Sequence, residues 1–217
     1  MDEAKKLLNE FEARIRENKL RRYRGMNRYA KKGETVMVGS SLMEHFMINE
    51  FLLAEGMDKV VYNRGVAGWR TDELLKNMDA CIFDLEPRKI FINIGSNDLD
   101  RPGDALGRLV KQYRKILRRI KERLPGCTVC VMAYYPVLRD FDPGESPANS
   151  KARTREGIEE ANRAIEALAA EMGCEFLDLN HVLKDEDGYL KPEFGADKVH
   201  LLPPAYKAVF DEIKRYL

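Results

Sequence analysis

The 217-residue sequence has almost no net charge and no long apolar run. Lysine and arginine (37) nearly balance aspartate and glutamate (36), which leaves a net charge of +1. This balance gives no reason to expect binding to nucleic acid or to an anionic membrane surface. No apolar run is long enough to cross a bilayer, and the N-terminal residues lack the apolar segment of a secretory signal. We therefore expect no nucleic-acid partner and no membrane span, and we expect the cytoplasm as the compartment.

Cysteine and histidine are also scarce, with four and three residues respectively. Cys127 and Cys130 have the C-x-x-C spacing found in redox and metal sites. They lie in an apolar run that predicts a strand, however, where side chains three apart point to opposite faces. No second Cys/His pair stands nearby. We therefore expect buried, reduced thiols, with no metal and no cofactor.

Hydrophobic residues make up 44% of the chain, enough for one sizeable core. Short apolar runs predict five strands, at residues 35–39, 58–63, 89–94, 127–133 and 175–179. Helical patterns separate them, including long ones at residues 103–124 and 154–172 and a last one that begins near Pro203. This alternation predicts an α/β fold, a three-layer αβα sandwich around a five-stranded parallel sheet. The single domain is expected over residues 33–217.

Residues 1–32 are expected to form an extra N-terminal amphipathic helix and a basic linker. Leu7, Leu8, Phe11 and Ile15 recur at helical spacing. The basic residues that follow, from Lys19 onwards, are interpreted as a solvated helix face, with an acidic partner as the less favoured alternative. The helix could also join two copies of the chain, so a homo-oligomer built through it is a further hypothesis.

One serine turn stands out. The apolar run at residues 36–39 ends in Ser40-Ser41, and a helical pattern follows at once. A serine there lies at the carboxyl end of a parallel strand, where α/β proteins bind ligands. Its alternative role is to cap the helix. Gly68 and Asn97 follow the next two strands along the chain, so the three residues are expected at one edge of the sheet.

Ester hydrolysis through a serine also requires a base. His45 lies inside the helix that Ser41 begins, so its side chain is expected to pack or to reach solvent. Two Asp-x-x-His pairs remain, Asp178 with His181 and Asp197 with His200. This spacing alone is a weak signal, and the residues alone leave both pairs open.

Four segments resemble, in order, the sequence blocks of the SGNH (GDSL-like) hydrolase superfamily. They are Gly-Ser-Ser-Leu at 39–42, Asn-Arg-Gly-Val-Ala-Gly at 63–68, Gly-Ser-Asn-Asp at 95–98 and Asp-Lys-Val-His-Leu at 197–201. The resemblance covers residues 35–217 and implies the flavodoxin-like SGNH hydrolase fold. It also implies catalytic roles for Ser41 as nucleophile, His200 as base and Asp197 as the group that holds the base, which ranks His200 above His181.

The resemblance further implies an oxyanion hole made by the backbone N–H groups of Ser41 and Gly68 and by the side chain of Asn97. Gly68 is preferred to Gly65 because it is the later glycine of the Gly-x-x-Gly turn. The chain departs from the family around His200, where Asp-Lys-Val-His replaces the common Asp-Gly-x-His and keeps both roles with a bulkier spacer. It also departs beside Ser41, since Ser40 stands where Asp is usual. This removes a negative charge beside the nucleophile but none of the catalytic groups.

Several side chains near the strand ends could line a substrate pocket, although core packing or surface exposure explains each equally well. They are Trp69, Arg70, Tyr134, Tyr135, Arg139 and Phe141. Residues 137–153, rich in Pro, Gly, Ser, Asn and Asp, form a long loop of the kind that is often functional or mobile.

The sequence therefore predicts a metal-independent serine esterase that cleaves a small-molecule ester with a short or medium acyl group. The alternatives are a lysophospholipase or thioesterase activity, or a catalytically silent binding module of the same fold.

Overall fold

Five parallel strands form the centre of the protein. In the computed structural model, which describes residues 3–140 and 153–217, they pair in the order β2-β1-β3-β4-β5. The strands are β1 (Thr35–Gly39), β2 (Val61–Asn63), β3 (Lys89–Asn93), β4 (Thr128–Met132) and β5 (Glu175–Leu177). The expected five-stranded parallel sheet is confirmed, with β2 and β5 shorter than predicted.

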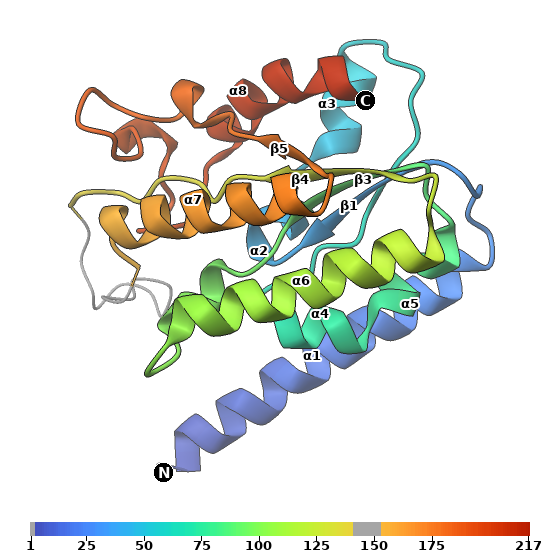
Figure 1. Ribbon diagram of the computed structural model, residues 1–217, viewed down its shortest axis with the longest axis horizontal. Coiled ribbons are helices and arrows are strands. Elements are labelled where there is room, and N and C mark those ends of the chain that lie inside the picture. Colours follow the sequence, from blue (N-terminus) through green and yellow to red (C-terminus); the bar gives the residue numbers. More distant parts are fainter. Residues whose placement is uncertain (1–2, 141–152) are drawn as a thin grey trace.

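Helices cover both faces of the sheet (Figure 1). The face with Val38 and Ile92 packs against α4 (Thr71–Lys76), α5 (Met78–Cys81), α6 (Ala105–Arg123) and α7 (Arg155–Glu171). The face with Met37 and Phe91 packs against α2 (Ser41–Glu44), α3 (Ile48–Ala54) and α8 (Pro203–Ile213). The expected three-layer sandwich is therefore confirmed.

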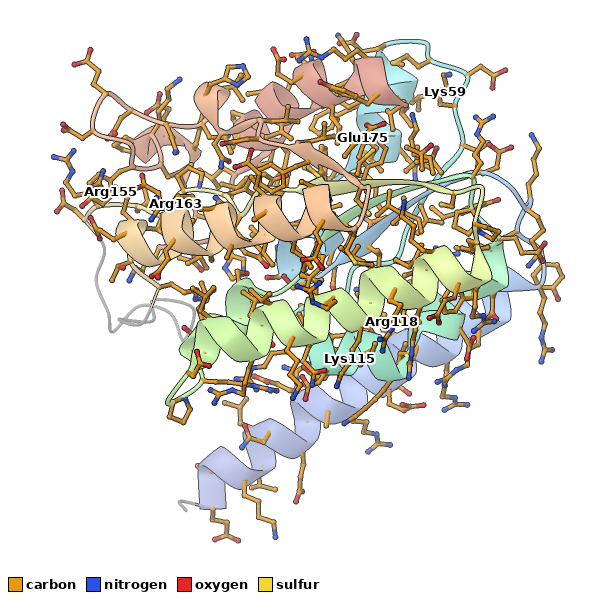
Figure 2. The ribbon with its side chains drawn as sticks, viewed as in Figure 1. Lys59, Lys115, Arg118, Arg155, Arg163 and Glu175 are labelled. Carbon is orange, nitrogen blue, oxygen red and sulfur yellow. The ribbon has the colours of Figure 1, made fainter. Side chains whose placement is uncertain are left out.

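Short 3₁₀ segments complete the described structure. They are η1 (Phe83–Leu85), η2 (Ser96–Asp100), η3 (Asn180–Val182), η4 (Pro192–Phe194) and η5 (Lys214–Tyr216). The outer faces of α6 and α7 are charged, and Figure 2 shows Arg118 and Arg163 on them. None of the helices described here is both long and apolar enough to cross a bilayer.

The N-terminal helix, α1 (Glu3–Asn27), lies outside the α4 and α5 layer (Figure 1). Its second half contacts the rest of the protein through Leu20, which is buried, and through Tyr23 and Asn27. The apolar residues that predicted this helix are instead exposed: Leu7 61%, Leu8 52%, Phe11 63% and Ile15 51%. Self-association through this helix stays a prediction.

The helical pattern after Ser41 gives two short helices rather than one. The break has a long-range cause, because the side-chain Nδ2 of Asn63 donates to the carbonyl oxygens of Met43 (2.5 Å) and Phe46 (3.1 Å). Carbonyls at a helix end need such partners. Asn63, the last residue of β2, therefore terminates α2 and holds it against the sheet.

At Gly39, the last residue of β1, there is no room for a Cβ atom. A Cβ at Gly39 would come 2.0 Å from the backbone oxygen of Asn93 on β3. We expect Gly39→Ala to lower the free energy of unfolding by at least about 1–3 kcal/mol, the usual cost of overpacking. Gly25→Ala in α1, where a Cβ would meet nothing within 4 Å, is the control and should stabilise by about 0.5–1 kcal/mol. Denaturant titrations of both variants test this, and unchanged stability of Gly39→Ala would contradict it.

Candidate active site

Three strand ends and one loop surround a single cavity of about 510 Å³. β1 is followed by Ser41, β2 by the turn that carries Gly68, and β3 by η2, which contains Asn97. The fourth contribution is His200, from the loop before α8. All four residues line the cavity. The meeting of the first three was expected, because the carboxyl ends of parallel strands share one edge of the sheet.

Ser41, His200 and Asp197 form a continuous hydrogen-bonded chain. The Nε2 atom of His200 lies 2.9 Å from Ser41 Oγ, and its Nδ1 atom lies 2.7 Å from Asp197 Oδ2. The backbone N–H groups of Val199 and His200 donate to the other carboxylate oxygen of Asp197 at 2.9 and 2.8 Å. This geometry orients His200 so that Nε2 can accept the Ser41 proton.

The Asp197 carboxyl remains ionised at neutral pH. Burial alone would raise its pKa, but hydrogen bonds from the His200 ring and from the two backbone N–H groups outweigh this effect. The pKa of Asp197 therefore lies below its ordinary value. A carboxylate at this position stabilises the imidazolium that forms when His200 takes a proton.

One long-range contact and one local bridge position the two halves of this site. The Tyr206 hydroxyl of α8 donates to the carbonyl oxygen of Leu42 in α2 at 3.0 Å. An isolated antiparallel bridge between Gly195 and Leu201 closes the loop that carries His200.

Ser41 is the first residue of α2, so its backbone N–H has no intrahelical partner.

Of the two glycines in the turn after β2, Gly68 has the properties of an oxyanion donor. It lines the cavity, and its φ of +73° lies in the left-handed region that favours glycine. The N–H of Gly65 is instead used by Asn63 Oδ1 at 2.9 Å. A Cβ at Gly65 would come 2.2 Å from the backbone nitrogen of Glu44, so Gly65 allows the turn to approach α2.

The side-chain amide of Asn97 is held in one orientation. Its Nδ2 atom donates to the carbonyl oxygen of Trp69 at 2.9 Å, and its Oδ1 atom lies 3.4 Å from Nη1 of Arg153. Since an amide carries two N–H groups, the second one is available for a ligand in the cavity. The neighbouring Asp98 accepts from both the backbone N–H and the hydroxyl of Thr71, which fixes η2 against α4.

Comparison with known proteins identifies the family of the chain. The model of the GDSL-like lipase/acylhydrolase family matches residues 45–208, well over half of the chain. The chain belongs to this family. The matched segment begins just after Ser41, so the Ser41 turn and α1 lie outside it. No curated protein matches the chain.

Solved structures share the GDSL-like fold. A Streptococcus pneumonia protein whose description names a platelet activating factor is 27% identical, with a TM-score of 0.88; the match covers 98% of this chain and 97% of the other. A GDSL-like lipase from Bacteroides thetaiotaomicron is 20% identical, with a TM-score of 0.73 and coverage of 91% and 96%. An acetylxylan esterase from Geobacillus stearothermophilus is 17% identical, with a TM-score of 0.62 and coverage of 85% and 94%. The last two are similar in fold alone.

The other two histidines occupy different surroundings in this GDSL-like protein. His181 is exposed and lies 3.9 Å from Glu212, so the Asp178–His181 pair is not part of the Ser41 site. His45, expected inside a helix, instead ends α2 and lines the cavity, with its ring centroid 5.6 Å from that of His200. Burial, together with the His200 ring, lowers the pKa of His45. A neutral His45 avoids placing a second positive charge beside the base.

Most of the expected pocket side chains lie elsewhere. Arg70 lines the cavity, but Trp69, Tyr134 and Tyr135 are at most 4% exposed and belong to the core. The reason is that helices cover both faces of the sheet, so aromatic side chains near the strand ends are buried between layers. Arg139 lies apart from the cavity and pairs with Asp187. Phe141 and most of the 137–153 loop lie outside the described residues.

Six polar residues that sequence reasoning did not select as pocket residues also line the cavity. They are Glu12, Arg16, Lys19, Glu44, Asp100 and Arg153, with Ile15 beside them. Asp100 and Arg153 form an ion pair at 3.2 Å, and Arg153 is 6% exposed. Glu44 and Asp100 had a usable signal, since each lies three residues after a predicted site residue, Ser41 or Asn97. Glu12, Arg16 and Lys19 come from α1, and Arg153 comes from the end of a long loop, where no motif marks them.

The cysteines show the chemistry of buried thiols. Burial raises the pKa of Cys81 and that of Cys130 to about 12, and the pKa of Cys127 to about 11. Such thiols are protonated at neutral pH and react slowly. Within residues 3–140 and 153–217, no group of three or more His, Cys, Asp and Glu side chains is arranged to hold a metal ion.

Ser40, in the position of the family's Asp, is 1% exposed, and its hydroxyl has no hydrogen-bond partner within residues 3–140 and 153–217.

Proposed function

We propose that this GDSL-like hydrolase cleaves a carboxylic ester with a short or medium acyl group through an acyl-serine intermediate. The observation that supports this most directly is the position of His200, whose two ring nitrogens lie 2.9 Å from Ser41 Oγ and 2.7 Å from Asp197 Oδ2. Nucleophile, base and orienting carboxylate are the groups that acyl transfer through serine requires. The chemical steps need no metal, because side chains supply each of these groups.

In the first half of the reaction, Ser41 Oγ attacks the ester carbonyl carbon while His200 Nε2 takes the hydroxyl proton. The backbone N–H groups of Ser41 and Gly68 and one N–H of Asn97 then bind the oxyanion. Each such donor contributes roughly 3–4 kcal/mol to the transition state. His200 returns the proton to the alcohol oxygen, the C–O bond breaks, and the acyl group remains on Ser41.

In the second half, His200 takes a proton from water, and the resulting hydroxide attacks the acyl carbon. The Ser41 oxygen leaves with the proton from His200, and the carboxylic acid is released. Asp197 keeps the Nδ1–H of His200 oriented in both halves, so His200 presents the same nitrogen to serine, alcohol and water.

The substrate is proposed to be a small-molecule ester. A cavity of about 510 Å³ lies within the roughly 300–1,000 Å³ typical of small-ligand sites. The similar fold of an acetylxylan esterase makes a carbohydrate acetyl ester one substrate to try. Lysophospholipid and thioester substrates are the alternatives. An ester panel that varies the acyl group and the alcohol separately distinguishes them.

A fluorophosphonate probe tests the proposed nucleophile. We expect the wild-type protein to gain one covalent adduct on Ser41, detected by mass spectrometry of its peptides, because an activated serine attacks phosphorus. Ser41→Ala should remain unlabelled. Ser40→Ala is the matched control and should be labelled like the wild type, since the Ser40 hydroxyl is buried next to the site without touching His200. A folded wild-type protein that stays unlabelled would favour the binding module.

A further inference from the structure

Helix α1 holds the turn that carries Gly68. Arg16 Nε donates to the carbonyl oxygen of Ala67 at 3.1 Å, and the Tyr23 hydroxyl donates to the carbonyl oxygen of Gly65 at 2.7 Å. The Arg16 guanidinium lies against Gly68, since a Cβ there would come 2.5 Å from Arg16 Nη2. Two side chains of α1, about two helical turns apart, therefore hold both ends of the turn.

The bond from Arg16 acts on the peptide group that ends in the Gly68 N–H. The Ala67 carbonyl and the Gly68 N–H belong to one planar trans peptide group, in which they point in opposite directions. Fixing the carbonyl therefore fixes the direction of the N–H. A hydrogen bond to the carbonyl also polarises the group and strengthens the N–H as a donor.

The preceding peptide group is held as well. The Ala67 N–H donates to Glu44 Oε2 at 2.6 Å, and Glu44 forms an ion pair with Lys19 of α1. Glu44 lies one helical turn after Ser41, so this contact joins the nucleophile's helix to the same turn. The backbone around Ala67 is thus held by α1 directly and through Glu44.

We propose that Arg16 is a positioning residue for ester hydrolysis. By holding the Ala67 carbonyl, it keeps the Gly68 N–H aimed at the oxyanion and strengthens that donor. This inference rests on the proposed function, in which Gly68 N–H binds the oxyanion. It assigns a role to α1, which lies outside the segment matched by the family model.

Two substitutions of nearly equal length separate the hydrogen bond from the other properties of Arg16. Arg16→Gln keeps an N–H donor at the same number of bonds from Cα as Arg Nε, whereas Arg16→Met has no donor. Both lose the positive charge and the ion pair with Glu12. Arg14→Met, on an exposed part of the same helix, is the surface control.

The measurement is kcat and KM for p-nitrophenyl acetate, with kcat expressed per fluorophosphonate-reactive Ser41. We expect Arg16→Met to lower kcat about tenfold without changing KM, less than the roughly 10²–10³-fold loss when an oxyanion donor is removed altogether. Arg16→Gln should keep kcat within about threefold of the wild type. Arg14→Met should match the wild type. Thermal unfolding confirms that each variant is folded.

Tyr23→Phe is a second, milder variant, since it removes one hydroxyl from the same turn; it should also lower kcat with KM unchanged. Equal losses in Arg16→Met and Arg16→Gln would assign the effect to charge and overturn the proposal. A rise in KM alone would place Arg16 on the substrate and also overturn it. If kcat is unchanged in both Arg16→Met and Tyr23→Phe, the proposed role of Arg16 is overturned. In that case, labelling of Ser41 in the wild type would still support the proposed esterase function. Absence of wild-type labelling would overturn both.

Discussion

Ser41→Ala is expected to lower kcat for p-nitrophenyl acetate by about 10⁶-fold, the size of loss seen when a serine nucleophile is removed from a catalytic triad. The reason is geometric, because within residues 3–140 and 153–217 the hydroxyl that bonds to His200 is that of Ser41: His200 Nε2 lies 2.9 Å from Ser41 Oγ, and its Nδ1 atom is occupied by Asp197. Without the nucleophile, only hydrolysis by water within the remaining oxyanion donors persists. Single-turnover and steady-state assays at one pH measure the loss.

The folded state should change little in this variant. Ser41 is 8% exposed, and its side chain contacts His200 at the edge of the cavity rather than the apolar core. Ser40→Ala is the control for any effect of altering this turn, and it should retain activity close to that of the wild type. Wild-type turnover in folded Ser41→Ala, or loss of turnover in Ser40→Ala alone, would refute the assignment of Ser41.

The sheet was predictable because its three central strands, β1, β3 and β4, are short apolar runs buried on both faces. Residues 35–39, for example, are all buried and match β1 at both ends. β2 is shorter than predicted because residues 58–60 are exposed and do not pair with β1. The break between α2 and α3 was not predictable, since it depends on Asn63, which is distant in sequence from the carbonyls that it binds.

The candidate active site was predictable only in part. Ser41 and His200 are 159 positions apart, and two Asp-x-x-His pairs have the same spacing. Only the path of the chain before α8 brings one pair to Ser41, and the family resemblance, not local chemistry, ranked it first. The aromatic residues near the strand ends lie at the expected edge of the sheet, but their side chains are in the core. Sequence periodicity does not distinguish an aromatic side chain packed between a helix and the sheet from one that lines a pocket.

The contribution of α1 could not be inferred from its pattern. The apolar stripe of Leu7, Leu8, Phe11 and Ile15 predicted an amphipathic helix, yet these side chains are half or more exposed. The helix contacts the rest of the protein through buried Leu20 and through polar groups, including those of Arg16, Tyr23 and Asn27. Such contacts depend on the positions of backbone carbonyls and of partner side chains, which no sequence periodicity reports.

The second large effect is expected from Asp197→Asn. The amide oxygen can still accept the backbone N–H groups of Val199 and His200, so the amide nitrogen would face His200 Nδ1. As a donor, it would favour the tautomer with hydrogen on Nε2, which cannot accept the Ser41 proton. We expect kcat to fall by about 10⁴-fold with KM nearly unchanged. Asp178→Asn, in the other Asp-x-x-His pair, is the matched control and should keep wild-type kcat; the opposite pattern would transfer the role to His181.

The same variant gives a prediction for stability against pH. The pKa of Asp197 is lower in the folded protein than its ordinary value, so ionised Asp197 contributes stability above the unfolded pKa of about 3.9. This contribution is lost as pH falls from the unfolded pKa through the lower, folded pKa, because the unfolded state takes up a proton in this range before the folded state does. The difference in unfolding free energy between wild type and Asp197→Asn should therefore be largest at pH 7 and shrink below about pH 4. Denaturant titrations at both pH values measure it. A difference that stays constant with pH would mean that the Asp197 carboxylate is not held by His200 as the geometry implies.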